Sequence, residues 1–130
     1  MPSDPTSSQT PLPPSHDASQ AAARDIGEVA AVEVITTAAV HLMTAAAVKC
    51  GLGEDTPGQR GRDLLDLDEA RKLITALAAL VTASAPDLGN QHARSLRDGL
   101  RSLQLAFREA SPFPDSPGDG PGETWTGAVS

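Results

Sequence analysis

The segment from Asp66 to Ala110 reads DLDEARKLITALAALVTASAPDLGNQHARSLRDGLRSLQLAFREA, and it repeats apolar residues at the spacing of an α-helix. In each half these residues recur at steps of three and four, which places them on one helix face. Asp66 precedes Glu69 by three residues, an acidic form of the capping-box spacing that marks a helix start. The pattern predicts two helices, each with one apolar seam: Ala70, Leu73, Ile74, Leu77, Leu80, Val81 and Ser84 in the first, and Ala93, Leu96, Leu100, Leu103, Phe107 and Ala110 in the second.

The connection between these two helices is short. Pro86 disfavours helical geometry in the residue before it, so we expect the first helix to end near Ala85. A turn over residues 87–90 then leads into the second helix. Helices joined so closely pack as an antiparallel hairpin.

A further helix is expected from about Ala21 to Cys50, and its strongest part lies in VEVITTAAVHLMTAAAVKCG, residues 32–51. The length approaches that of a membrane span, which needs about 20 predominantly apolar residues. Many of these residues are alanines of low hydrophobicity, and Glu33 and His41 lie among them, which opposes insertion. We therefore expect a helix of a protein with no membrane association.

The polar residues of this helix form one narrow stripe, made of Glu33, Thr36, Thr37, His41 and Thr44. The rest of its circumference is apolar, and the hairpin can cover only one side of it. We expect a second copy of the chain to cover the remainder, so the protein should be a homo-oligomer. The expected interface residues are Val32, Ile35, Ala39, Leu42, Met43 and Ala46.

The ends of the chain differ from its middle in composition. Residues 1–22 are rich in Pro, Ser and Thr and should be a disordered arm. Residues 23–110 should form the helical domain, with a flexible connection at 51–65, and the Pro/Gly-rich residues 111–130 should be a second disordered tail. The expected fold is all-α, with three main helices. A single cysteine and the absence of a secretory pattern at the start predict a cytoplasmic protein.

No motif in the sequence points to catalysis, a cofactor or a metal. His41 and Cys50 would lie about 13 Å apart along a helix, too far to share one metal ion. Gly53 and Gly58 have the spacing of a phosphate-binding loop, but Gln59 and Arg60 replace its Lys and its Ser or Thr. We expect no enzymatic activity, no catalytic residues and no cofactor.

In the last predicted helix, four arginines each come one residue after an apolar residue of the seam, so they line its edge. We call this set the Arg ridge; it consists of Arg94, Arg97, Arg101 and Arg108. The segment 89–110 carries a net charge of +2, and 111–130 carries −3. The ridge is interpreted as a solvated surface whose stems cover the seam edge, or as a docking site for an anionic partner such as RNA. The overall charge of −7 makes nucleic acid an unlikely general partner.

Trp125 is the only tryptophan and lies in the polar tail, in GETWTGAVS. Two interpretations stay open. The side chain is exposed and idle, or it docks on a groove of the helical body or on a partner, with the acidic tail toward the Arg ridge.

The segments VEVITTAAVHLMTAAAVKCGLGED, LDEARKLITALAALV, APDL and LRDGLRSLQLAFREAS resemble the actinobacterial branch of the bacterial family called domain of unknown function 1844. The resemblance runs from about Ala23 to Val129 and is most specific over residues 96–111. The stretch TPGQRGRDLL before Asp66 is longer than the family pattern. The resemblance implies a small helical cytoplasmic protein without an assigned activity, so it supplies no functional residues.

Two functions are therefore expected. The first is a non-enzymatic helical protein-interaction module that self-associates and binds an unknown protein partner. The alternative is a ribosome-associated or RNA-associated accessory protein that uses the Arg ridge.

Overall fold

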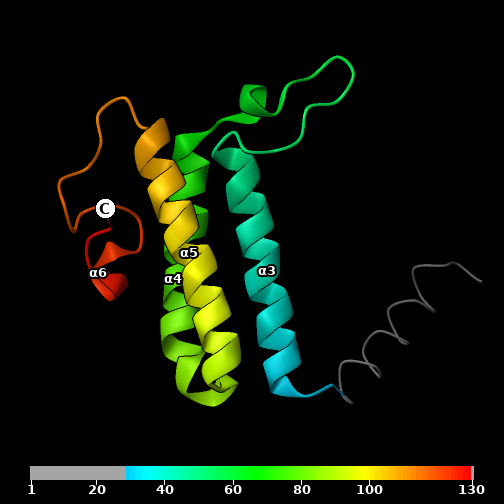
Figure 1. The fold of residues 1–130 in the computed structure, drawn as a ribbon, viewed down its shortest axis with the longest axis vertical. Coiled ribbons are helices and arrows are strands. Elements are labelled where there is room, and N and C mark those ends of the chain that lie inside the picture. The colour runs from blue at the N-terminus through cyan, green and yellow to red at the C-terminus, as the bar shows by residue number, and fades with distance from the viewer. Residues whose placement is uncertain (1–28, 130) are drawn as a thin grey trace, which may run out of the picture. The chain divides into compact units, whose positions relative to one another are not determined.

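A computed structural model of the chain describes residues 29–129. The regular structure in this range is helical: α3 (Ala31–Lys49), the 3₁₀ turn η1 (Gly61–Leu64), α4 (Leu67–Leu88), α5 (Asn90–Ala110) and α6 (Glu123–Thr126) (Figure 1). The prediction of an all-α fold with three main helices is confirmed. The disordered arm predicted over 1–22 lies outside the described residues. The chain separates into two compact units between Val34 and Ile35, and the packing described below lies within the second unit.

The hairpin of α4 and α5 is the centre of this unit. Asp66 caps α4, because its Oδ1 accepts a hydrogen bond from the backbone N–H of Glu69 at 3.2 Å. Gly89 alone joins the two helices, with a φ of 86° that favours glycine. The largest fully buried side chains belong to the predicted seams: Ile74, Leu77, Val81 and Leu100. The predicted hairpin is therefore confirmed.

The end of α4 differs from the prediction. The helix continues through Pro86 to Leu88 instead of ending near Ala85. Pro86 lies in the last turn, where the missing N–H removes a single hydrogen bond near a helix end, and Leu88 is buried just before Gly89. Burial of Leu88 in the hairpin offsets the local cost of the proline.

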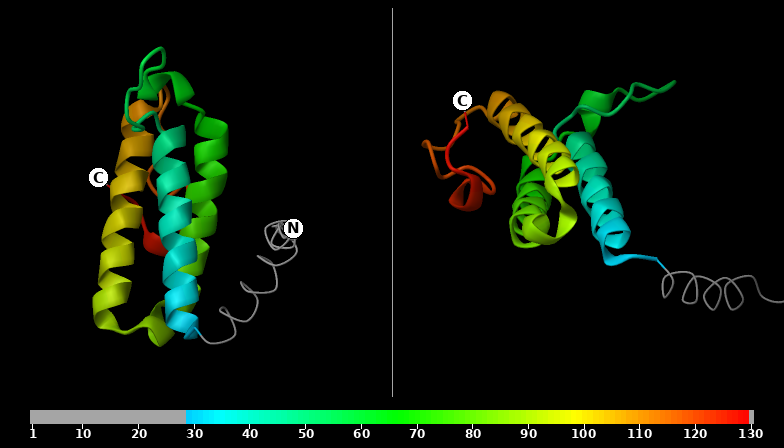
Figure 2. Two further views of the ribbon diagram at one scale, coloured as in Figure 1. Left: turned by 90° about the vertical axis from the view of Figure 1, so that its right-hand side faces the viewer. Right: turned by 60° about the horizontal axis from the view of Figure 1, so that its bottom comes forward.

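Helix α3 packs on the hairpin through one line of residues. Ala39, Ala46 and Cys50 are buried, and the side chain of Met43 lies so close to Gly99 of α5 that a Cβ there would meet its sulfur at 2.8 Å. The other side of the same hairpin carries α6 (Figures 1 and 2). Of the described helices, α3 has the length and apolar composition that could cross a membrane, with a mean hydropathy of 1.6, and only 11% of that apolar stretch is buried. Much of its apolar surface is thus uncovered in a single chain.

The connection between α3 and α4 is structured, although a flexible connection was predicted at 51–65. Asp55 Oδ1 accepts a hydrogen bond of 2.7 Å from the N–H of Gly61, the first residue of η1. Gly61 lies directly against the backbone of Gly53, which leaves no room for a side chain. At the end of the connection, the N–H of Asp66 donates to the carbonyl of Lys49 at 2.8 Å. Local hydrogen bonds of this kind are not visible in hydrophobic periodicity.

The disordered tail predicted over residues 111–130 is wrong for residues 111–129. This C-terminal segment, which we define as residues 111–129, folds back along the hairpin and ends in a buried Val129 (Figure 2). Its short helix α6 contacts α4. The physical reason lies in polar side chains of the hairpin, Arg71, Gln104 and Arg108, which hydrogen-bond to the segment.

Candidate functional site

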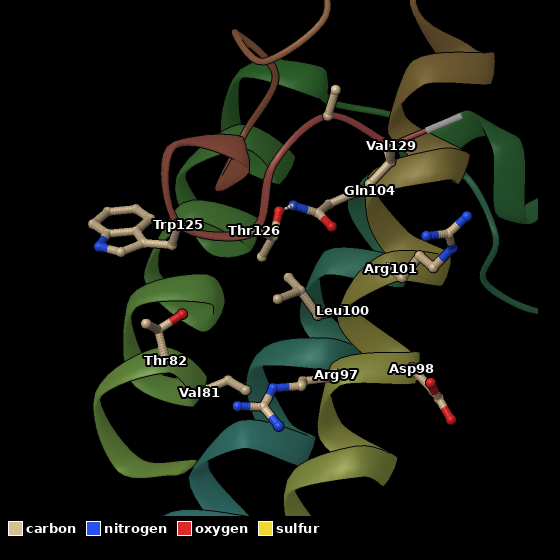
Figure 3. A pocket seen from close by; sticks show the side chains of 11 residues that line it. Val81, Thr82, Arg97, Asp98, Leu100, Arg101, Gln104, Trp125, Thr126 and Val129 are labelled. Atoms are coloured by element: carbon tan, nitrogen blue, oxygen red, sulfur yellow. Dashed lines mark hydrogen bonds between the residues drawn. The ribbon is translucent and has the colours of Figure 1, made fainter. Parts of the chain in front are cut away.

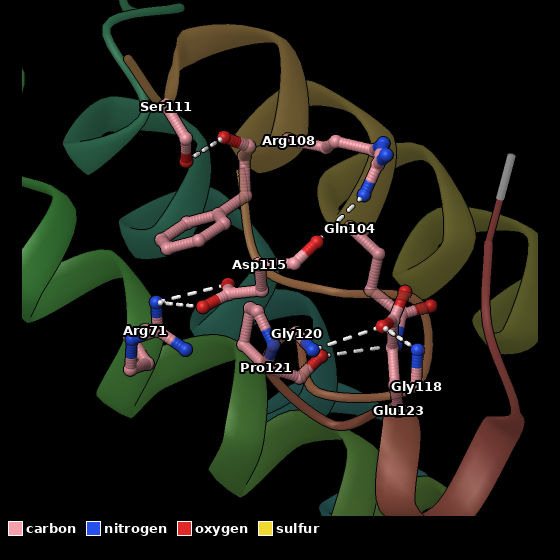
Figure 4. A network of polar contacts seen from close by, with 10 residues as sticks. Arg71, Gln104, Arg108, Ser111, Asp115, Gly118, Gly120, Pro121 and Glu123 are labelled. Carbon is pink, nitrogen blue, oxygen red and sulfur yellow. Dashed lines mark hydrogen bonds and ion pairs between the residues drawn. The ribbon is translucent and has the colours of Figure 1, made fainter. Parts of the chain in front are cut away.

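Glu123 is the central anchor of the C-terminal segment. The residue is only 6% exposed, and its carboxylate accepts three backbone hydrogen bonds, of which Figure 4 shows those from Gly118 and Gly120. Oε1 accepts from the N–H groups of Gly118 and Gly120 at 3.0 and 2.9 Å, and Oε2 accepts from Val129 at 2.9 Å. Bonds to an ionised acceptor are stronger than neutral ones, and together they offset the cost of burying the carboxylate. Glu123 thereby closes residues 118–129 into a compact loop.

Gln104 of α5 holds this loop on the hairpin. Its amide is buried, and Nε2 donates to the carbonyl of Pro121 at 3.1 Å and to Thr126 Oγ1 at 3.0 Å. Gly122 of the same loop packs against Ala78 of α4. A Cβ added at position 122 would lie 2.6 Å from the Cβ of Ala78. The φ of Gly122 is also positive, at 77°. This contact therefore requires glycine for both space and backbone conformation.

Asp115 ties the start of the C-terminal segment to both helices of the hairpin. Its carboxylate accepts two hydrogen bonds from Arg71 Nη2, at 3.2 and 3.0 Å, and its carbonyl accepts one from Arg108 at 3.1 Å (Figure 4). The Arg71 guanidinium also lies 4.9 Å from the centre of the Phe107 ring, a cation–π contact. Because the Arg71 side chain is 44% exposed, this ion pair fixes geometry more than it adds stability.

Trp125 fits neither of the two open interpretations completely. The segment around it docks on the helical body, but the indole itself remains 47% exposed and is not the anchor. It forms one wall of a cavity of about 370 Å³ between the C-terminal segment and the hairpin (Figure 3). The other walls come from α4, α5 and the last residues of the segment: Val81, Thr82, Arg97, Asp98, Leu100, Arg101, Gln104, Thr126, Ala128 and Val129.

The Arg ridge does not act as one surface. Arg108 is half-buried and bonded to the C-terminal segment, whereas Arg94, Arg97 and Arg101 are exposed. Arg97 and Arg101 line the cavity beside Trp125, and Arg94 does not. Among the described residues, Asp115 of the acidic tail bonds to Arg108 of the ridge and also to Arg71 of α4, a residue outside the predicted ridge.

The predicted oligomer interface on α3 is partly wrong. Ala39 and Ala46 are completely buried within the single chain, and Met43 packs on Gly99, so these three residues face the chain's own hairpin. The six predicted residues, Val32, Ile35, Ala39, Leu42, Met43 and Ala46, centre on this inward line. Periodicity finds the apolar arc of a helix, but it does not say which part of the arc the same chain covers.

The residues considered for chemistry do not assemble a reactive group. His41 is exposed on α3, and Cys50 is buried at its end, where burial raises the pKa of the thiol. Within residues 29–129, no three His, Cys, Asp or Glu side chains gather closely enough to hold a metal ion.

The fold and this site define an all-helical domain, a hairpin flanked by one apolar helix and one anchored terminal segment. The chain belongs to the family described as Domain of unknown function (DUF1844), whose model matches residues 31–109. This confirms the family resemblance found in the sequence. No curated protein and no solved structure matches the chain. The family match covers the anchors Arg71, Gln104 and Arg108, but it ends before the segment that they hold.

Proposed function

We propose that this protein is a non-enzymatic interaction module that self-associates through α3. The observation that carries the proposal is an uncovered apolar line on one flank of this helix, formed by Ile35, Ala38, Leu42 and Ala45, which we call the α3 seam. Ala38 is exposed, and the other three side chains are only half-buried. Their spacing of 3, 4 and 3 residues is that of a helix–helix contact.

The pattern of side-chain sizes favours a second copy as the occupant of the α3 seam. When two seams are set antiparallel about Val40, Ile35 lies opposite Ala45 and Ala38 lies opposite Leu42. Each branched side chain then faces an alanine, so both helices can approach closely and interdigitate. In the antiparallel arrangement the two helix dipoles also point in opposite directions, which is electrostatically favourable. The polar residues Thr37, His41 and Thr44 stay exposed on the far side.

A pair of matched variants tests this proposal. Ala38→Glu adds a charge at the centre of the α3 seam, and Thr37→Glu adds the same charge one residue away on the polar side. Glutamate is a good helix former, so both variants should keep the fold of the single chain. In the dimer, the charge at position 38 would be buried against an apolar side chain. A buried charge without an ionic or hydrogen-bonding partner costs several kcal/mol.

Sedimentation velocity at high micromolar concentration measures the outcome. We expect a dimer for wild type and Thr37→Glu, and a monomer with unchanged circular dichroism for Ala38→Glu. A monomeric wild type, or equal behaviour of the two variants, would contradict self-association through this seam.

The alternative function, an RNA-associated accessory protein, rests on the exposed Arg94, Arg97 and Arg101. It predicts RNA binding whose affinity falls steeply with salt, since each neutralised phosphate releases counterions. Arg108 contributes little to such a surface, because it bonds Asp115. RNA binding that is lost on joint Arg94→Gln and Arg97→Gln substitution would favour this function over the first.

A further inference from the structure

We propose that the cavity beside Trp125 is a binding site for a small amphipathic anion, a ligand with one anionic head on a flat or short apolar body. The cavity lies between α4, α5 and the C-terminal segment (Figure 3). It is separate from the α3 seam, because α3 contributes none of its lining residues.

The apolar part of the ligand would fill the space between the indole of Trp125 and the side chains of Val81 and Leu100. Leu100 and Val81 are almost completely buried and form a fixed floor, whereas the Trp125 indole is half-exposed and offers a free face. The volume of about 370 Å³ lies near the lower end of the range for small-molecule sites, about 300 to 1,000 Å³. This size admits one or two rings or a short acyl chain.

The anionic head would pair with Arg97. Its guanidinium points toward Val81 in Figure 3, whereas the carboxylate of the neighbouring Asp98 points away. Arg97 has no ion-pair partner among residues 29–129. The hydroxyl groups of Thr82 and Thr126 are further polar groups at the lining. An unpaired planar cation beside an apolar floor and an aromatic wall matches a carboxylate or phosphate attached to an apolar body.

The charge of the site decides the class of ligand. A cationic ligand would meet Arg97 and Arg101 at the wall, and a neutral apolar ligand would leave Arg97 unused.

Two dyes with the same aromatic body test the proposal on the full chain. Anilinonaphthalene sulfonate carries an anionic head, and N-phenylnaphthylamine lacks it. Trp125 is the only tryptophan, so quenching of its emission with rise of dye fluorescence reports a dye bound beside it. We expect the sulfonate to bind the wild type in the micromolar range and more tightly than the neutral dye.

Arg97→Gln should weaken binding of the sulfonate about tenfold and leave the neutral dye within about twofold, as expected for one partly exposed charge-assisted contact. Arg94→Gln is the matched control: it removes the same charge three residues earlier on α5, outside the cavity. Circular dichroism shows whether each variant keeps its helices.

Octanoate and octyl phosphate, used as competitors, distinguish a carboxylate head from a phosphate head. Displacement of the sulfonate dye by either supports the site. The proposal is overturned if neither competes at millimolar concentration, if the dyes bind equally well, or if Arg97→Gln and Arg94→Gln weaken the sulfonate to the same extent.

Discussion

Replacing Glu123 by Gln should detach the C-terminal segment from the hairpin. The carboxylate accepts hydrogen bonds from three backbone N–H groups, and an amide has one oxygen and one NH₂ group. If the amide oxygen keeps the bonds from Gly118 and Gly120, its NH₂ faces the N–H of Val129, and that bond is lost.

The expected loss follows from these contacts. A hydrogen bond to a charged group contributes about 1.5 to 3 kcal/mol, and a neutral one contributes about 1 kcal/mol. Losing the bond from Val129 and weakening the other two should reduce the docking free energy of the segment by about 2 to 4 kcal/mol. Solvent screens these hydrogen bonds little, since Glu123 is only 6% exposed.

Fluorescence of Trp125 during urea titration measures this loss, because the residue lies within the docked segment. For an m value of about 1 to 2 kcal/mol/M, the midpoint should fall by about 1 M or more. Acrylamide should also quench Trp125 more strongly in the variant. Circular dichroism at the same urea concentrations should show that the α4 and α5 hairpin persists after the fluorescence has changed.

The control is Asp119→Asn, which removes the same charge from an exposed side chain of the same segment. It should leave the fluorescence midpoint unchanged. Equal midpoints for Glu123→Gln, Asp119→Asn and wild type would refute the role of Glu123 as anchor.

Three further predictions concern the segment, the core and the thiol. Gly122→Ala should loosen the segment more than Gly118→Ala by Trp125 fluorescence, because both have positive φ but only a Cβ at 122 clashes with Ala78; equal effects would count against the contact. Leu77→Ala should lower the free energy of unfolding by about 2 to 5 kcal/mol in denaturation followed by circular dichroism, and near-wild-type stability would contradict its burial. In the folded protein, Cys50 should react with a disulfide reagent at about one tenth of the rate of free cysteine or less, and unfolding should remove the difference. Burial blocks access to the thiol and raises its pKa, which lowers the thiolate fraction at mildly alkaline pH. A fast reaction in the folded protein would contradict this.

The hairpin was predictable because its signals are local. The 3–4 spacing of apolar residues, the cap at Asp66 and the short connection at Gly89 all lie within a few residues of the structure that they determine. For α3, periodicity indicated the apolar arc and the polar stripe. It did not indicate that Ala39 and Ala46 would face the chain's own hairpin, because this depends on tertiary packing.

The C-terminal segment was not predictable from composition. Its Pro/Gly-rich composition indicated a disordered tail, yet it is held by polar contacts between residues distant in sequence, such as Arg71 and Asp115 at a separation of 44. One signal was present: Gln104 lies four residues after Leu100 and three before Phe107, so it is a polar side chain on the apolar face of its helix. A buried amide requires hydrogen-bond partners, and Pro121 and Thr126 supply them.

The family match ends at residue 109, before the C-terminal segment begins, and this affects how the protein should be shortened or fused to other sequences. A protein cut at residue 109 would keep every residue of the match but would lose the cover over Ala78 and Gln104, leaving apolar surface open to aggregation. A purification tag added after Ser130 would start next to Val129, whose side chain is buried and whose backbone N–H donates to Glu123. Shortened versions should therefore extend to residue 129, and tags belong at the other end of the chain.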